Sequence, residues 1–177
     1  MTLSADTRNA AMQEALRLLV RALGEARAYN EVVLEIMRQG VAVSPFTDIA
    51  QTMWDDLEER GCIQRVRSIG AEHVTLTAGG WLEGLKVADL YDTPEQRARI
   101  LTLRRTLVDL NRGRPTGGTR TSTMVIAGLT GLPIAWVTSA VNSQLLCHWH
   151  PDKRMELEIG TRGRVVIPAR FDADAST

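Results

Sequence analysis

The short run Cys147-His148-Trp149-His150 holds residue types that bind transition metals. Thiolate and imidazole groups bind zinc, but a tight site needs about four ligands, and no further Cys or His lies near this run in the sequence. Histidine catalysis is the other chemistry to consider, with His73 as the third histidine of the chain. Exposed positions on a hairpin or at a helix end explain these side chains more simply. The sequence therefore predicts no metal site.

Paired carboxylates and a glycine-rich loop are two further candidates. Asp55-Asp56 and Glu58-Glu59 could perform general acid–base catalysis, yet adjacent residues on a helix point apart, and a solvated helix face is the simpler interpretation. The Gly- and Arg-rich run 112–118 lacks the Lys-Ser/Thr ending and the preceding strand of a phosphate-binding loop. The sequence therefore predicts a protein that is not an enzyme and holds no cofactor.

Charge is unevenly distributed along the 177 residues, although the formal net charge is zero. Residues 1–95 hold 9 Lys/Arg against 15 Asp/Glu, a net charge of −6, whereas residues 96–170 hold 12 against 4, a net charge of +8. Of the 21 basic residues, 19 are Arg, whose guanidinium group can bind a phosphate or a guanine edge in two places. The basic half is therefore suited to nucleic acid, and the acidic half is not.

No hydrophobic run reaches the roughly 18 residues that a membrane span needs, and Met1–Asp6 lacks the pattern of a signal peptide. We therefore expect a cytoplasmic protein that does not bind membranes. Cys62 and Cys147 lie 85 positions apart among apolar neighbours, which favours buried free thiols over a disulfide.

The first half of the chain predicts three helices, a hairpin and a fourth helix. Apolar residues recur every three or four positions in the helical segments, and two β-prone runs follow Gly61. In order, the expected elements are helices over 7–24, 32–40 and 44–60, strands over 62–67 and 73–77, and a helix over 78–90.

Part of this half is similar to the recognition helix and wing of MarR-type regulators. The likeness lies within Ser44–Gly80 and rests on the runs Leu57-Glu58-Glu59-Arg60-Gly61-Cys62-Ile63 and Leu76-Thr77-Ala78-Gly79-Gly80. The resemblance implies a winged-helix module. Its presumed recognition helix carries five carboxylates, however, and these charges would repel phosphates. We therefore expect a structural or partner-binding role for this half.

The second half predicts a long helix followed by a loop, a second helix and a hairpin. The long helix begins at Pro94, with Thr93 as its N-terminal cap, and carries Leu and Ile at helical spacing as far as Leu110. The later segments are expected to be a flexible polar loop over 111–121, a helix over 133–147, and a hairpin of 155–159 and 164–167.

A helix-turn-helix pattern lies between the loop and the hairpin. The run Ile126-Ala127-Gly128-Leu129-Thr130-Gly131-Leu132-Pro133, followed by Val137 and Ala140, resembles the core shared by IclR-type and many other bacterial regulators. Two helices that cross steeply need a small residue where they nearly touch, here Ala127, and a turn residue that tolerates positive φ, here Gly131. Leu132, Val137 and Ala140 are then expected to face inward.

Together these patterns predict a mainly α fold with small β-hairpins, an α+β class, arranged as two winged-helix modules in tandem. The expected boundaries are 1–92 for the first module with its leading helix, 93–170 for the second module, and 171–177 for a disordered tail. The chain is long enough for two small cores of roughly 80 residues each.

The leading hypothesis is a bacterial or phage-type transcriptional regulator that binds double-stranded DNA and acts as a homodimer. The expected DNA contacts come from the outward side of the helix over 133–147, from arginines around it, and from the first hairpin. These residues are Trp136, Thr138, Ser139 and Asn142 on the helix, Arg112, Arg114, Arg120, Arg162 and Arg164 around it, and Arg65 and Arg67 on the first hairpin.

The alternative hypothesis is a non-enzymatic adaptor that uses tandem winged helices for protein contacts in a larger complex. The helix over 133–147 has no Lys or Arg of its own, and an outward Trp136 would suit an apolar partner. The zero net charge and the acidic first half favour the adaptor, whereas the arginine-rich second half favours the DNA-binding regulator.

Overall fold

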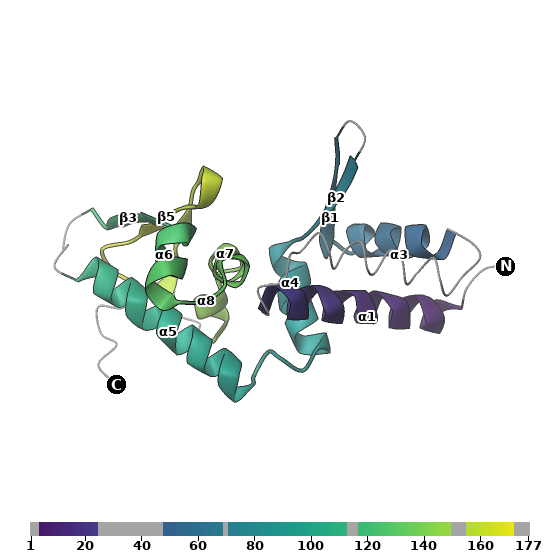
Figure 1. The fold of residues 1–177 in the computed structure, drawn as a ribbon, viewed down its shortest axis with the longest axis horizontal. Helices are drawn as coiled ribbons and strands as arrows, with labels where there is room; N and C mark the ends of the chain where they lie inside the picture. The colour runs from purple at the N-terminus through teal and green to yellow at the C-terminus, as the bar shows by residue number, and fades with distance from the viewer. Residues whose placement is uncertain (1–3, 25–47, 69–70, 113–116, 150–154, 172–177) are drawn as a thin grey trace. The chain divides into compact units, whose positions relative to one another are not determined.

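The computed structural model describes residues 4–24, 48–68, 71–112, 117–149 and 155–171. The chain divides into two compact units, Met1–Tyr91 and Asp92–Thr177, each with its own helices and its own antiparallel sheet (Figure 1). Seven α-helices and two small sheets lie within the described ranges, which confirms the mainly helical α+β class. None of the helices in these ranges is long and apolar enough to cross a membrane.

The first unit contains three helices and a hairpin among its described residues. These are α1 (Ala5–Gly24), α3 (Asp48–Glu59), β1 (Ile63–Ser68), β2 (Ala71–Leu76) and α4 (Ala78–Val87). The predicted first helix, hairpin and last helix are confirmed, although β2 begins two residues earlier and α4 ends three residues earlier than expected. The helix expected over 32–40 and the start expected at 44 lie outside the described residues.

The core of the first unit forms where α1 and α3 meet the base of the hairpin. Its buried side chains come from both helices, both strands and the turn before β1: Met12, Ala15, Leu16 and Leu19 of α1, Met53, Trp54 and Leu57 of α3, Cys62 of the turn, Ile63 of β1 and Val74 of β2. Helix α4 is joined to this core through Thr77, whose hydroxyl accepts the Gly80 N–H at 3.0 Å and donates to the Gly61 carbonyl at 2.6 Å.

Asp56 differs from the solvated acidic face that the sequence predicts for α3. It is buried, and its carboxylate binds Arg8 of α1: Nε of Arg8 donates to Oδ2 of Asp56 at 2.8 Å, and a second guanidinium N–H donates to Oδ1. The hydrogen bond from Arg8 lowers the pKa of the Asp56 carboxyl below its usual value, against the opposing effect of burial. This ion pair links α1 to α3.

Replacing Asp56 by Asn is expected to destabilise the first unit at neutral pH. Because the folded-state pKa lies below the value of about 3.9 for an unfolded chain, the ion pair stabilises the fold above about pH 4 and loses this contribution as the pH falls through the folded-state value. The difference in unfolding midpoint between the wild type and Asp56→Asn should therefore shrink between about pH 5 and pH 2. Denaturant unfolding followed by hydrogen exchange of residues 52–65 measures this difference. A difference independent of pH would show that the charge of Asp56 is not what stabilises the unit.

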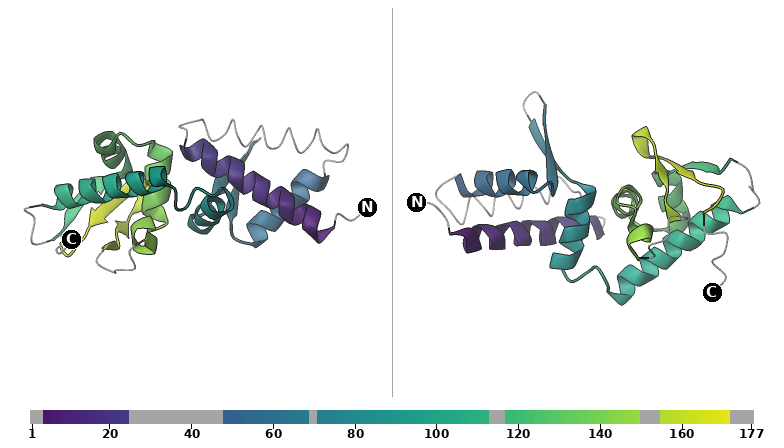
Figure 2. Two further views of the ribbon diagram at one scale, coloured as in Figure 1. Left: turned by 90° about the horizontal axis from the view of Figure 1, so that it is seen from below. Right: turned by 180° about the vertical axis from the view of Figure 1, so that it is seen from behind.

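The second unit begins with a long helix that packs against later helices, and a three-stranded sheet completes the unit (Figure 2). Its elements are α5 (Pro94–Asn111), β3 (Thr119–Ser122), α6 (Thr123–Thr130), α7 (Ile134–Asn142), α8 (Leu145–Trp149), β4 (Glu158–Ile159), a 3-10 turn (Thr161–Gly163) and β5 (Arg164–Ile167). The strand order in the antiparallel sheet is β3-β5-β4. The predicted hairpin is therefore present as β4 and β5, although β4 begins three residues later than expected.

Local signals read from the sequence of this unit are confirmed. Thr93 caps α5 by accepting the Gln96 N–H at 3.1 Å. Gly131 ends α6 with a φ of +69°, as the turn between two helices requires. Val137 and Ala140 are buried, whereas Leu132 is only partly buried.

Three expectations for this unit are wrong. The end of the expected flexible loop, residues 119–121, belongs to β3, which pairs with β5. The helix expected over 133–147 ends at Asn142, because Gln144 takes a φ of +53° and its side-chain amide binds both backbone groups of Leu157. The disordered tail cannot begin at 171, because Phe171 is buried, and residues 172–177 lie outside the described part of the chain.

Candidate nucleic-acid interface

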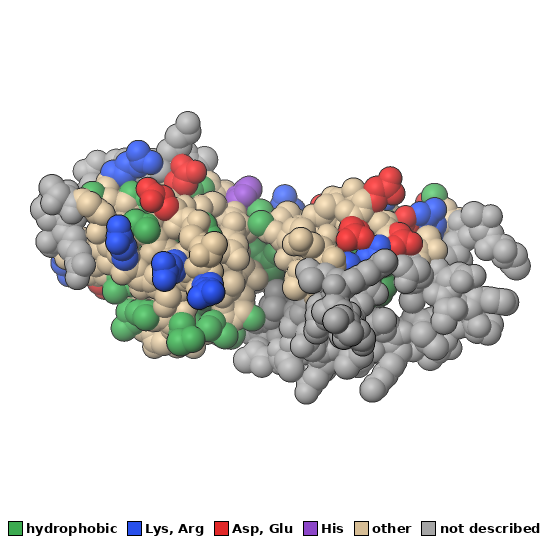
Figure 3. Space-filling model, turned by 90° about the horizontal axis from the view of Figure 1, so that it is seen from above, with side chains coloured by type: hydrophobic (Ala, Val, Ile, Leu, Met, Phe, Trp, Pro, Cys, Tyr) green, Lys and Arg blue, Asp and Glu red, His purple; other side chains and the backbone are tan. Residues whose placement is uncertain are grey.

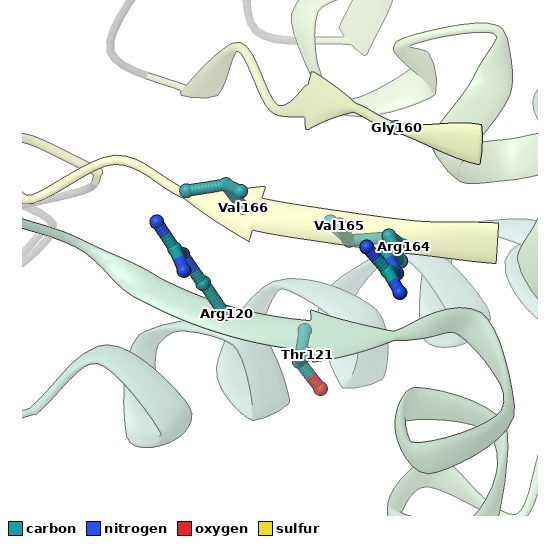
Figure 4. A pocket seen from close by; sticks show the side chains of 6 residues that line it. All are labelled: Arg120, Thr121, Gly160, Arg164, Val165 and Val166. Atoms are coloured by element: carbon teal, nitrogen blue, oxygen red, sulfur yellow. The ribbon is translucent and has the colours of Figure 1, made fainter. Parts of the chain in front are cut away.

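Arg120 of β3 and Arg164 of β5 lie on the exposed face of the three-stranded sheet. The register pairs Arg120 with Val166 and Ser122 with Arg164, while the alternate residues Val165 and Ile167 are buried. An open groove of about 650 Å³ lies on this sheet and is lined by Arg120, Thr121, Gly160, Arg164, Val165 and Val166 (Figure 4). Both guanidinium groups therefore border one groove, although their strands are far apart in the sequence.

Strand β3, on one side of the groove, lies in a part of the chain without negative charge. No Asp or Glu occurs from Leu110 to Pro151. Arg120, Arg162 and Arg164 form no ion pair with another described residue, whereas Arg112 pairs with Asp109 at 3.1 Å. The register places one carboxylate on the same sheet face, that of Glu158, which is paired with Val166. Within the described ranges, three arginines are thus left to bind an anionic ligand.

The turn between β4 and β5 holds Arg162 next to the start of α6. Arg162 and Gly163 have φ values of 58° and 70°, so two consecutive residues are left-handed. A Cβ at position 163 would lie 2.8 Å from Oγ1 of Thr123, which shows how closely the turn packs against the first residue of α6. Left-handed φ is uncommon for Arg, and such residues cluster at binding sites. The turn presents Arg162 to solvent.

Helix α7 presents an uncharged surface, polar apart from the exposed Ile134 at its start. Of the residues predicted to read DNA, Asn142 is exposed, and Thr138 and Ser139 are half-buried. The hydroxyl and amide groups of these side chains can bind base edges or phosphates, but α7 contains no Lys or Arg. The cations of the interface therefore come from the sheet and its turn, and α7 adds only neutral hydrogen-bonding groups.

The prediction that Trp136 contacts DNA or a partner is wrong. Its side chain is only 2% exposed, and its indole N–H donates to Oε1 of Gln96 in α5 at 3.2 Å. The Arg99 guanidinium lies over the ring, 5.9 Å from its centroid. Trp136 is therefore a core residue that joins α7 to α5.

Arg65 is the basic side chain of the first hairpin that the structure describes, and it is not available to bind a ligand. It is 8% exposed and binds Oε2 of Glu58 at 2.6 Å and Oδ1 of Asp55 at 2.5 Å. The expectation that it helps to bind phosphates is wrong, because two carboxylates of α3 already neutralise it. The side chains of Arg67 and His73, and residue Arg114, lie outside what the structure describes.

The candidate metal ligands are not brought together. Among the described residues, no three His, Cys, Asp or Glu side chains are placed to hold a metal ion, and His150 lies outside them. Cys62 and Cys147 are free thiols; the first is buried and the second is half-buried.

Comparison with known proteins assigns no family to this chain. No family model, no curated protein and no solved structure matches it. The resemblances to MarR-type and IclR-type regulators therefore stay predictions from the sequence.

The three arginines could be predicted from the sequence, but their place on one sheet and its adjoining turn could not. The decisive contact is the pairing of β3 with β5, because it places Arg120 beside Arg164. The run Thr119-Arg120-Thr121 contains two β-branched residues, a signal that could have indicated a strand. Glu158 was also missed, since only the register of β4 shows that it shares the face of the arginines.

Proposed function

We propose that the second unit is a winged-helix domain that binds double-stranded DNA mainly through the phosphate backbone. The observation that carries the proposal is the shared groove of Arg120 and Arg164, with Arg162 on the adjoining turn. The order helix, strand, helix-turn-helix and hairpin, with the sheet order β3-β5-β4, supports the winged-helix assignment.

The chemistry of these side chains determines the kind of recognition. Arginine binds phosphate through a rigid fork of donors, and each neutralised phosphate releases counterions. Sequence readout would rest on the neutral groups of Thr138, Ser139 and Asn142, so the domain should discriminate weakly between DNA sequences. A cytoplasmic regulator of bacterial or phage type, acting as a homodimer, is the biological role that fits this activity.

The first unit is poorly suited to bind DNA. Its hairpin arginine Arg65 is bound by carboxylates, and its half of the chain has a net charge of −6 over residues 1–95. We assign it a winged-helix fold with a structural or partner-binding role, so that the second unit alone binds DNA.

The test compares the wild type with Arg120→Ala/Arg164→Ala on a random-sequence duplex by fluorescence anisotropy over a range of salt concentrations. Loss of two phosphate contacts should weaken binding by about tenfold and reduce the slope of log K against log salt by about 2. Arg60→Ala removes an exposed arginine from the first unit and should leave binding nearly unchanged. Equal affinity and slope for the double variant and the wild type would refute the proposed interface.

Glu158→Gln tests the same face of the sheet, with the opposite expected effect on DNA affinity. Its carboxylate shares the sheet face with Arg120 and Arg164, so it repels an approaching phosphate. Its neutralisation should tighten DNA binding by a few-fold at low salt, and the gain should fade as salt screens the charge. A weaker complex would place the DNA elsewhere.

A further inference from the structure

The outer side of α6 is an apolar surface that the proposed DNA contact does not use. Met124 is 71% exposed, Val125 49% and Leu129 59%, and Ile134 at the start of α7 is 49% exposed. We call these four residues the α6 patch. Figure 3 shows hydrophobic side chains gathered beside Lys and Arg side chains on one face of the second unit. Large apolar side chains that cluster in solvent are typical of interaction surfaces.

The periodicity of α6 separates this patch from the core. At 3.6 residues per turn, Met124, Val125, Gly128 and Leu129 fall within an arc of about 140°. The opposite side of the helix carries Ile126 and Ala127, which are buried. The helix is therefore apolar on both sides, and only one side is covered by its own unit.

Gly128 leaves a notch in the middle of the patch. A Cβ at this position would meet no atom within 4 Å, so nothing in the protein itself requires glycine here. Glycine is also less favourable than alanine inside a helix. Its effect is to let another main chain or side chain approach α6 closely between Met124 and Leu129.

Positive charge borders the patch at the N-terminal end of α6. Arg164 is paired with Ser122, the residue that caps the helix, and the turn that holds Arg162 packs against Thr123. No carboxylate lies on α6 or α7. A second copy of the chain would bring the same cations to the interface and be repelled. DNA would satisfy the cations but would offer little apolar surface to the aliphatic side chains.

We propose that the α6 patch docks an amphipathic helix of a partner protein, with an apolar stripe that covers Met124, Val125, Leu129 and Ile134 and with acidic residues that meet Arg162 and Arg164. Such helices insert side chains at spacings of three and four into an apolar surface. The charged rim then sets the orientation of the bound helix and the choice of partner. The apolar side chains of this site take no part in the proposed DNA contact, whereas its charged rim, Arg162 and Arg164, is shared with that contact.

The test selects binders of the full chain from a displayed library of amphipathic helices of about 18 residues. The apolar stripe is varied among Leu, Ile, Phe and Met, and the flanking positions among Glu, Lys and Ser. We expect enrichment of Glu-flanked peptides. A synthetic peptide of the enriched sequence should bind the wild type, and Leu129→Glu should lower its affinity by at least about tenfold. Leu101→Glu, an equivalent change at an exposed leucine of α5, should not.

Gly128→Ala separates docking from folding. The new methyl group has free space within the protein, so the thermal midpoint of the second unit should rise while peptide binding weakens.

No enrichment, equal enrichment of Lys-flanked peptides, or equal binding to Leu129→Glu overturns the proposal. A wild-type dimer that Leu129→Glu converts into a monomer would identify a second copy as the occupant. Equal losses of DNA and peptide binding would assign the patch to the DNA interface. Both of these results also overturn the proposal.

Discussion

Trp136→Ala is expected to destabilise the second unit by about 3–5 kcal/mol, a large part of the stability of a small domain. The ring is almost fully buried, so its removal leaves a cavity between α7 and α5. It also removes the hydrogen-bond donor that faces Gln96. Hydrogen exchange should show lost protection in α5 and α7, and DNA binding should fall together with the folded fraction.

Trp136→Phe is the matched control. Phenylalanine keeps much of the apolar volume and loses the indole N–H, so it should cost clearly less than alanine. If Trp136→Ala instead kept wild-type stability and lost only ligand binding, the ring would have to lie on a recognition surface, contrary to the structure.

Gly80→Ala is expected to destabilise the first unit by about 3 kcal/mol. A Cβ at position 80 would lie 1.8 Å from the carbonyl oxygen of Cys62 and 2.5 Å from its carbonyl carbon, so the backbone of α4 or of Cys62 must move. That movement would strain the Thr77 cap, which binds Gly80 and Gly61. Denaturant unfolding followed by hydrogen exchange in α1, α3 and α4 measures the loss.

Gly79→Ala provides a control one residue away in the same helix. A Cβ there has its nearest neighbour, Oγ1 of Thr77, at an ordinary 3.8 Å, so this change should be neutral or slightly stabilising. Equal effects of the two substitutions would contradict the close approach of α4 to Cys62. Because each unit has its own core, Gly80→Ala should leave exchange in the second unit unchanged, and Trp136→Ala should leave the first unit unchanged.

Features set by local backbone chemistry could be predicted from the sequence. Thr93 and Pro94 start α5, Gly131 closes the turn after α6, and the polar run 160–163 separates β4 from β5. Each of these depends on a few adjacent residues, whose preferences for caps, turns and left-handed φ act wherever they occur. The α+β class follows from the same local patterns.

Features that depend on distant partners could not be predicted. Arg65 looks like a phosphate-binding residue until the hairpin folds against α3 and brings Glu58 and Asp55 to it. Arg120 looks like a loop residue until β3 pairs with a strand more than 40 residues later. Side-chain burial, ion pairing and strand pairing depend on contacts between distant segments. No short window of sequence contains both members of such a contact.

The sequence by itself determined most of the described helices, the turn at Gly131 and the arginine-rich character of the second half, because propensity and charge are properties of individual residues and their close neighbours. The tertiary structure alone decided which of those residues reach a ligand. It buried Trp136, neutralised Arg65, placed Arg120 and Arg164 at one groove and left the outer side of α6 uncovered. The physical reason is that a side chain is free to bind only when the packing of distant segments has neither buried it nor supplied it with a partner.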